Sequence, residues 1–284
     1  MATQKVWLIT GTAKGFGLEF VKAALESGDK VIATVRSKPE QLAATLRHHP
    51  DLFIVQMDVT NEAQVKAAVQ EGITHFGRLD VVINNAGYGL IGGIEEATDA
   101  ETRRQYDTNV FGLLNVTRAV LPTLRQQQSG HLINISSLFS YDARAGVALY
   151  GSTKFAVRGI SQGLAVELAP FGIHVTDVAP GLFSTEFVSS DSYAPVGHPI
   201  ADYDETPVGQ LRTNIAQYHK AQPGDPQKLA QVVVQLVAAA QPPLQLPIGQ
   251  DAVDLYQQSV AKLEQEITPW LAQATSTDHV AAVA

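Results

Sequence analysis

The sequence predicts an α/β fold in which helices cover both faces of a doubly wound parallel sheet of six to seven strands. Short β-branched runs alternate with longer segments of helical spacing, which is typical of parallel strands joined by crossover helices. The strand segments are nearly continuous apolar runs, as burial on both faces of a sheet requires.

The individual elements follow from composition and period. Val65, Val69 and Ile73 recur at i, i+4 and i+8 within one predicted helix, and Pro39 suits the first turn of another. The predicted strands cover residues 5–10, 30–36, 52–57, 79–84, 132–135 and 174–179, with a further short one near 244–247. The predicted helices cover residues 15–27, 39–47, 62–76, 98–127, 148–171, 226–240 and 251–273.

The chain is predicted to form a single Rossmann-fold domain over residues 1–284, because no linker rich in Pro, Gly or Ser divides it. The core of that domain is expected at about 4–250. An irregular stretch at about 182–225 is too long for a passive connection, so it is predicted to form a substrate lid. A last helix and a small, polar tail make up 251–284.

The bulk composition narrows the classes of function. The formal net charge is −8, so we expect no nucleic-acid partner. The chain has no cysteine, and its histidines lack metal-ligand spacing, so we expect neither thiolate catalysis nor a metal site. The longest apolar stretch, 232–240, is about half of what a membrane span needs. With no signal-like leader before the first strand, we expect a cytoplasmic protein.

The stretch from Ser136 to Lys154 indicates the chemistry. A hydroxyl pair, Ser136-Ser137, follows an apolar strand, and Tyr150 comes thirteen residues after Ser137. Lys154 lies one turn further on, so a helix here would put the phenol and the ammonium on one face. Moving the pKa of a tyrosine from about 10 to neutrality takes about 4 kcal/mol, which one cation about 4 Å away can supply. We therefore hypothesise the centre of a carbonyl reductase or alcohol dehydrogenase.

A glycine-rich turn follows the first strand and reads Thr10-Gly11-Thr12-Ala13-Lys14-Gly15-Phe16-Gly17. Its glycines allow a tight turn and a close approach to a pyrophosphate, whose charge suits the N-terminus of the next helix. Alone the motif is a weak signal, because many glycine-rich turns are only turns.

Together these stretches resemble the short-chain dehydrogenase/reductase superfamily, in its single-domain branch. The glycine turn is similar to the family's T-G-x-x-x-G-x-G. Further matches follow in the family's order at Asp58, Asn84-Asn85-Ala86-Gly87, Asn109, Ser137, Tyr150, Lys154, Pro180-Gly181 and Thr185. The run from Asn84 to Glu186 is similar to the 17β-hydroxysteroid dehydrogenase and retinol dehydrogenase-like carbonyl reductases.

The resemblance implies a catalytic set of Asn109, Ser137, Tyr150 and Lys154. Tyr150 would exchange a proton with the substrate oxygen, and Ser137 would hold that oxygen. Lys154 would also bond the nicotinamide ribose, and Asn109 would hold a relay water. The implied cofactor-binding residues are Gly11, Thr12, Lys14, Gly15, Phe16, Gly17, Arg36, Ser37, Asp58, Val59, Asn85, Ala86, Gly87, Tyr150, Lys154, Pro180, Gly181 and Thr185. Taken singly, Asp58 and the Asn/Gly cluster are equally typical of turns.

The end of the second strand predicts the cofactor. NAD-binding sheets place a carboxylate there, which would repel a 2′-phosphate. By resemblance that place belongs to Val35, and Arg36 follows it. Arginine binds phosphate with two donors at once, and Lys14 adds a cation on the same side. We therefore predict NADP(H), with ordinary solvated charges as the alternative reading of these two cations.

The substrate side departs from the family. Positions two and three after the serine are commonly a small residue and a glycine, whereas this chain has Phe139 and Ser140. The predicted pocket is apolar and partly aromatic, and suits a bulky carbonyl or secondary alcohol. Its residues are Phe139, Tyr141, Tyr88, Leu90, Phe183 and Phe187, and their alternative role is packing under the lid.

Two other functions compete with this one. An NADPH-binding sensor without turnover would keep the fold but should carry a damaged catalytic set, which this chain does not. An epimerase acting through a transient ketone would retain its cofactor instead of releasing it. The resemblance also implies a homodimer or homotetramer that pairs the helices predicted at 98–127 and 148–171.

Overall fold

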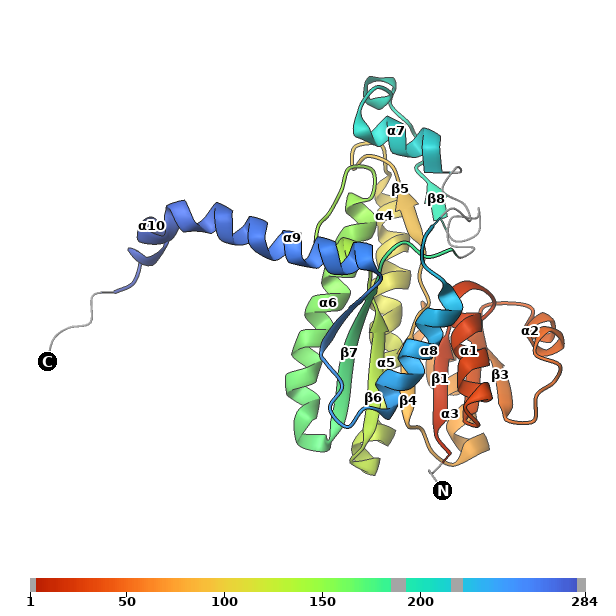
Figure 1. Cartoon of the computed structure of the whole chain (residues 1–284). Coiled ribbons are helices and arrows are strands. Elements are labelled where there is room, and N and C mark those ends of the chain that lie inside the picture. The colour runs from red at the N-terminus through yellow and green to blue at the C-terminus, as the bar shows by residue number, and fades with distance from the viewer. Residues whose placement is uncertain (1–3, 185–192, 216–221, 280–284) are drawn as a thin grey trace, which may run out of the picture.

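A seven-stranded, fully parallel sheet forms the centre of the protein (Figure 1), and confirms the predicted fold class. The computed structural model describes residues 4–184, 193–215 and 222–279. The strand order is β3-β2-β1-β4-β6-β7-β9. The strands are β1 (Val6–Thr10), β2 (Lys30–Val35), β3 (Leu52–Gln56), β4 (Val81–Asn84), β6 (Gly130–Ile135), β7 (Ile173–Pro180) and β9 (Gln245–Ile248).

Helices cover both faces of this sheet. Alternate strand residues point to opposite faces, and each face has its own apolar core. One core joins the sheet to α1 (Gly15–Glu26) and α8 (Pro226–Ala238). The other joins it to α3 (Glu62–Phe76), α5 (Leu113–Gln127) and α6 (Ala148–Leu168). The remaining helical segments are α2 (Pro39–Thr45), α4 (Asp99–Tyr106), η1 (Asp107–Gly112), η2 (Leu138–Ser140), η3 (Ala169–Phe171), η5 (Ala201–Tyr203), α7 (Pro207–Asn214), α9 (Gln250–Ile267), η7 (Thr268–Trp270) and α10 (Leu271–Thr275).

The helix predicted over 98–127 is interrupted. It begins after Thr98, whose side chain and that of Glu101 form a reciprocal capping box. A six-residue π-helical segment, η1, then separates α4 from α5. Such wide turns shift the register of a helix and are often found at functional sites. Asn109 lies inside η1 and is buried.

A second, two-stranded parallel sheet lies beside the carboxyl ends of the main sheet. Its strands are β5 (Gly89–Ile91) and β8 (Tyr193–Pro195). The sequence does not predict either strand, because three residues are too short to carry a periodic signal. The irregular stretch predicted at 182–225 therefore contains a strand, a 3₁₀ turn and the helix α7.

Acidic residues between β5 and α4 and in the first turn of α4 anchor the described part of this stretch. Glu101 accepts a hydrogen bond from Gly197 N at 2.9 Å, and Glu95 accepts one from the Tyr203 hydroxyl at 2.7 Å. The buried Glu96 carboxylate accepts from Ile200 N at 2.8 Å and forms an ion pair with Arg212. These contacts place α7 above β5 and β8 (Figure 1).

The last helix, α9, leaves the sheet and extends away from the body of the protein (Figure 1). Its first turns pack against Leu138 and Phe139 of η2 through Ala252 and Leu255. Beyond them the helix is exposed, and Val260 and Leu263 are 51% and 57% accessible. No helix among the described residues is long and apolar enough to span a membrane.

Candidate active site

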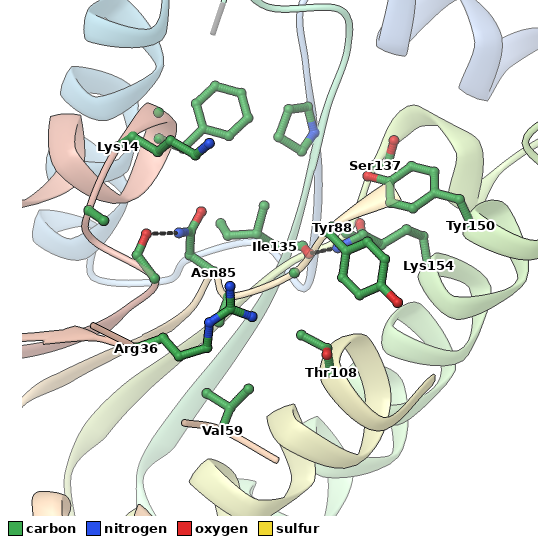
Figure 2. Close-up of a pocket in the computed structure, with 18 of the residues that line it drawn as sticks. Lys14, Arg36, Val59, Asn85, Tyr88, Thr108, Ile135, Ser137, Tyr150 and Lys154 are labelled. Atoms are coloured by element: carbon green, nitrogen blue, oxygen red, sulfur yellow. Dashed lines mark hydrogen bonds between the residues drawn. The ribbon is translucent and has the colours of Figure 1, made fainter. Parts of the chain in front are cut away.

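A cavity of about 570 Å³ opens at the carboxyl ends of the central strands, where α/β sheets of this kind bind ligands. Its wall comes from the β1–α1 turn, from the ends of β2, β3, β4, β6 and β7, and from α6. Figure 2 shows Lys14 and Arg36 on one side of the cavity, and Ser137, Tyr150 and Lys154 on the other.

The β1–α1 turn is shaped by its glycines. Gly11 has φ +69°, a left-handed conformation that side chains rarely adopt. A Cβ on Gly17 would collide with the Gly11 carbonyl oxygen, so only glycine lets α1 begin this close to the turn. The N-cap residue of α1, Lys14, makes no side-chain capping hydrogen bond to the first turn. The backbone N–H groups of that turn therefore receive no capping bond from the N-cap side chain.

The floor of the cavity is fixed by Thr10 at the end of β1. Its hydroxyl accepts hydrogen bonds from Asn85 N and Ala86 N, both at 2.9 Å. The Asn85 side chain in turn donates to the carbonyl oxygens of Thr10 at 2.9 Å and Gly11 at 3.1 Å. These bonds tie the Asn-Asn-Ala-Gly turn after β4 to the glycine turn after β1. Asp58 lies at the same edge, where its carboxylate accepts from Thr60 N at 2.9 Å.

The end of β2 carries no acid toward the cavity. Val35 is buried and lines the wall, and the exposed Arg36 and Ser37 follow it. Among the described residues, Arg36 forms no ion pair with an acidic side chain. Its guanidinium group is directed into the cavity, on the side of Val59 and Thr108 (Figure 2).

The three residues with acid–base chemistry meet on the opposite wall. Ser137 follows β6, whereas Tyr150 and Lys154 share the face of α6 that packs on the sheet. The Lys154 ammonium donates to Ile135 O at 2.9 Å and lies 5.6 Å from the centre of the Tyr150 ring. Phe139 packs its ring edge-on to Tyr150 at 6.3 Å between ring centres.

Burial dominates the electrostatics of this wall. Burial raises the pKa of Tyr150 to about 12, against a smaller lowering by the Ser137 hydroxyl. Burial also lowers the pKa of Lys154 to about 8, and Asp177 partly offsets that effect. From the sequence, Lys154 alone was expected to bring the pKa of Tyr150 to neutrality. In the structure burial raises that pKa, and the effect that opposes burial comes from the Ser137 hydroxyl.

Asn109 lies behind the wall and organises it. Its side-chain oxygen accepts from Tyr88 N at 3.0 Å, and its amide donates to Tyr88 O at 2.9 Å. The same amide donates to the Thr153 hydroxyl at 3.0 Å. Asn109 therefore joins the turn after β4 to the helix that carries Tyr150 and Lys154.

Most of the residues predicted for the site line this one cavity. Those that do are Gly11, Lys14, Gly15, Phe16, Arg36, Ser37, Asp58, Val59, Asn85, Ala86, Gly87, Tyr88, Ser137, Phe139, Tyr150, Lys154, Pro180, Gly181 and Phe183. Thr12, Gly17 and Asn109 support it from behind, where the Thr12 hydroxyl donates to Thr34 O at 3.0 Å. Thr185 and Phe187 lie outside the described residues.

Two residues predicted for the substrate pocket do not line the cavity. Leu90 is buried within β5. Tyr141 turns away, with its ring centre 4.6 Å from the Arg158 guanidinium, and packs edge-on against Tyr256 at 5.2 Å between ring centres. Both side chains pack the structure around the pocket instead of forming its surface.

Other lining residues were missed by the sequence analysis. Met57, Thr60 and Ser136 immediately precede or follow a predicted site residue, and Ile135 lies two residues before Ser137, so the strand ends could have indicated them. Arg104 and Thr108 line the cavity from α4 and η1, where only their i, i+4 spacing hinted at a shared face. The remaining missed residues are Ala13, Leu182 and Gln222.

A family model described as short chain dehydrogenase matches residues 5–194. Two curated relatives are similar over most of their length. Oxidoreductase BOA17 of Botryotinia fuckeliana is 39% identical over 252 residues, which cover 88% of this chain and 90% of that one. The 3-ketodihydrosphingosine reductase of Bacteroides thetaiotaomicron is 36% identical over 245 residues, covering 86% and 88%.

Solved structures share the fold. A short-chain dehydrogenase from Streptomyces avermitilis is 36% identical and superposes with a TM-score of 0.90, covering 98% of this chain and 100% of that one. ElxO with NADP bound has a TM-score of 0.73 at 28% identity, covering 89% and 100%. The 3-ketoacyl-(acyl-carrier-protein) reductase from Brucella melitensis, complexed with NADH, has a TM-score of 0.71 at 27% identity, covering 86% and 96%.

Proposed function

The chain belongs to the short-chain dehydrogenase family and is an oxidoreductase, and from this premise we propose that it transfers hydride between NADP(H) and a carbonyl or secondary alcohol. One observation carries the proposal. Ser137, Tyr150 and Lys154 line the same cavity as the glycine turn, so a nucleotide and a substrate carbonyl could meet there.

The residues present fit a dinucleotide. The glycine turn leaves room for a pyrophosphate against the N-terminus of α1, where N–H donors and the helix dipole favour an anion. In this proposal Gly11 to Gly17 hold the pyrophosphate, Asp58 and Val59 hold the adenine, and the turn at Asn85 to Gly87 supports the rest. The nicotinamide, when bound, would supply or accept the hydride.

A preference for NADP(H) is part of the proposal. Val35 at the end of β2 leaves that position without a carboxylate, and the Arg36 guanidinium is directed into the cavity beside it. An arginine can bind two phosphate oxygens at once. Related structures contain NADP or NADH, so support for NADP comes from these residues and not from the family.

In the proposed mechanism Tyr150 is the proton donor during reduction and the acceptor during oxidation. Ser137 holds the substrate oxygen by a hydrogen bond next to the phenol. Lys154 keeps a positive charge close to that phenol, which favours its ionised form. Burial opposes this ionisation, so Tyr150 is mostly protonated and suited to reduction at neutral pH.

We propose a bulky, apolar substrate. Tyr88, Phe139, Leu182 and Phe183 line the same cavity as the reactive side chains. Phe139 leaves less room beside Ser137 than a small residue would, so an extended apolar group fits better than a compact polar one. A relative that is 36% identical is named for the reduction of a 3-ketodihydrosphingosine, which is consistent with a ketone on an apolar chain.

We also propose that the protein is cytoplasmic and forms a homodimer or homotetramer. Phe111, Phe155 and Val166 are 54%, 42% and 78% accessible on η1 and α6, and a second copy would cover such apolar groups. Light scattering after size exclusion measures the mass, and a strictly monomeric protein would contradict this part of the proposal.

Tyr150→Phe tests the mechanism. We expect the variant to bind NADPH with unchanged affinity and to lose at least about 100-fold in turnover, because the acid–base group is removed. NADPH oxidation is followed at 340 nm with a panel of aldehydes, ketones, quinones and steroids. The matched control is Tyr106→Phe, which removes a hydroxyl that only donates to Ser152 at 2.8 Å. Wild-type rates in Tyr150→Phe would contradict the mechanism.

A further inference from the structure

A row of polar side chains crosses the sheet one layer below the active site. Asn84 on β4 pairs with Asn134 on β6, Asn134 with Asp177 on β7, and Asp177 with Gln245 on β9. Residues directly opposite each other point to the same face, and here that face is covered by α5 and α6. We call these four residues the polar row.

The two neighbours of Asp177 in the polar row, Asn134 and Gln245, both form side-chain hydrogen bonds. Asn134 accepts from Asn84 at 2.9 Å and donates to the Ser161 hydroxyl of α6, also at 2.9 Å. At the other end Gln245 accepts from the Arg158 guanidinium at 3.1 Å. Two side chains of α6, Ser161 and Arg158, therefore fix the positions of Asn134 and Gln245.

Asp177 is the exception in this row. It is fully buried, and neither carboxylate oxygen has a hydrogen-bond partner of good geometry within the described part of the chain. The nearby Ser136 hydroxyl donates to Val178 O at 3.2 Å instead. Burial raises the pKa of Asp177 to about 6, with opposing effects of Ser136, Arg158 and Lys154. Burial of a carboxylate without hydrogen bonds costs free energy, which nearby positive charge would offset.

Two cations of α6 bracket this carboxylate. Lys154 and Arg158 are one turn apart on the face of α6 that packs on the sheet. The Lys154 ammonium reaches Ile135 O at 2.9 Å, one residue beyond the partner of Asp177 on β6. The Arg158 guanidinium reaches Gln245, the partner of Asp177 on β9. Asp177 thus lies between the strand positions to which both cations are bound.

We propose that Asp177 is a positioning residue for the reaction, whose carboxylate is the counter-charge that keeps Lys154 in its ammonium form beneath Tyr150. This inference rests on the proposed function. Lys154 and Arg158 carry like charges on one helix face in a buried setting, which favours deprotonation of the lysine. An anion between them reverses that tendency, and the polar row fixes where the anion stands.

Other ionisable groups around Asp177 do not replace it. The charged and titratable groups that face it are Lys154 and Arg158 from α6, Tyr141 after η2 and, behind Tyr141, Tyr256 from α9. The pKa of Tyr141 is raised to about 12 by burial and by Asp177, so its phenol is neutral. Asp177 is the sole anion of this group.

The first experiment measures the charge of Lys154 directly. Protein labelled with ¹³C at the lysine ε-carbons is titrated by NMR without cofactor, and Lys154 is assigned with Lys154→Arg. In Asp177→Asn we expect the midpoint of Lys154 to fall by about one pH unit, because an opposite charge is removed. An unchanged midpoint overturns the inference, whatever the activity of the enzyme.

The second experiment follows carbonyl reduction by NADPH against pH. Both Tyr150 and Lys154 must be protonated, and removing a nearby anion lowers the pKa of both groups. The alkaline limb of kcat should therefore move to lower pH in Asp177→Asn, giving about a tenfold deficit at pH 9. Below about pH 6 the wild-type carboxyl is protonated too, so the two profiles should converge. A deficit that is equal at every pH indicates a merely structural role and overturns the inference.

The matched control is Thr176→Val, the neighbouring residue on the opposite face of β7. Its hydroxyl donates to Pro243 O at 2.7 Å and lies 2.9 Å from His131 Nε2, and neither partner belongs to α6. We expect this variant to keep both the Lys154 midpoint and the wild-type profile. If wild type turns over no carbonyl while the Lys154 midpoint still shifts in Asp177→Asn, the proposed function fails and the electrostatic coupling stands.

Discussion

The two sides of the cavity are built by different means. On the side of α1 the surface is mostly backbone, shaped by Gly11 and Gly17 and held by the hydroxyl of Thr10. On the side of α6 it consists of buried side chains, whose partners come from distant parts of the chain. Lys154 reaches back to Ile135, and Asn109 joins segments 21 and 44 residues away. The first side depends on shape, and the second on charge and hydration.

The largest effect is expected where shape leaves no room. Gly17→Ala would drive a Cβ into the Gly11 carbonyl oxygen, so we expect NADPH affinity to fall at least about 100-fold, equivalent to about 2.7 kcal/mol. Fluorescence titration measures the dissociation constant. The control is Gly163→Ala on the exposed face of α6, where a Cβ meets nothing within 4 Å and helix propensity should stabilise by up to about 1 kcal/mol. An unchanged NADPH affinity in Gly17→Ala would show that the α1 side of the cavity does not depend on its shape.

A smaller effect is expected from the charges on the α1 side. Val35→Asp/Arg36→Ser places a carboxylate at the end of β2 and removes the guanidinium, so the ratio of kcat/KM for NADPH over NADH should fall about 100-fold. Higher salt should shrink the difference, because Arg36 is exposed. Lys38→Ser, an exposed cation outside the cavity lining, should leave the ratio unchanged. If the double variant also keeps the wild-type ratio, the assignment to NADP(H) is wrong.

The smallest effect on turnover is expected from Asn109→Ala. Loss of three hydrogen bonds should destabilise the fold by about 2–3 kcal/mol and lower kcat about tenfold, as Tyr88 and Thr153 lose a common partner. Gln127 offers a matched control, because its amide bonds both backbone groups of Leu79 at the far end of α5. Gln127→Ala should lose similar stability, seen in urea unfolding, with kcat unchanged. Equal losses of kcat in both variants would show that Asn109 acts only on stability.

The features predicted from the sequence are those with a local signature. The central strands were recognisable because burial on both faces makes them continuous apolar runs. The glycine turn was recognisable because the backbone geometry within a few residues requires glycine at positions 11 and 17. The pairing of Tyr150 with Lys154 needed only the helical period.

What the sequence hid depends on contacts between distant segments. Nothing around Asn109 predicts a π-helical segment, and the side chain of Asn109 finds its partner in Thr153 of α6, 44 residues away. Tyr141 was predicted to line the substrate pocket, but its ring packs against Arg158 and Tyr256 outside the cavity. Asp177 did leave a signal, a charged residue inside an apolar strand, whose meaning appears only once its neighbours on β6 and β9 are known.

The placement of β9 at the edge of the sheet bears on how the protein is made. β7 gains its outer neighbour only when Gln245–Ile248 pairs with it, and Asp251 then accepts from Leu182 N at 2.6 Å at the cavity wall. Until the ribosome has released this late segment, a nascent chain would present β7 as a bare apolar edge, which invites aggregation. Chaperone dependence during synthesis should therefore centre on the interval between the emergence of β7 and of β9.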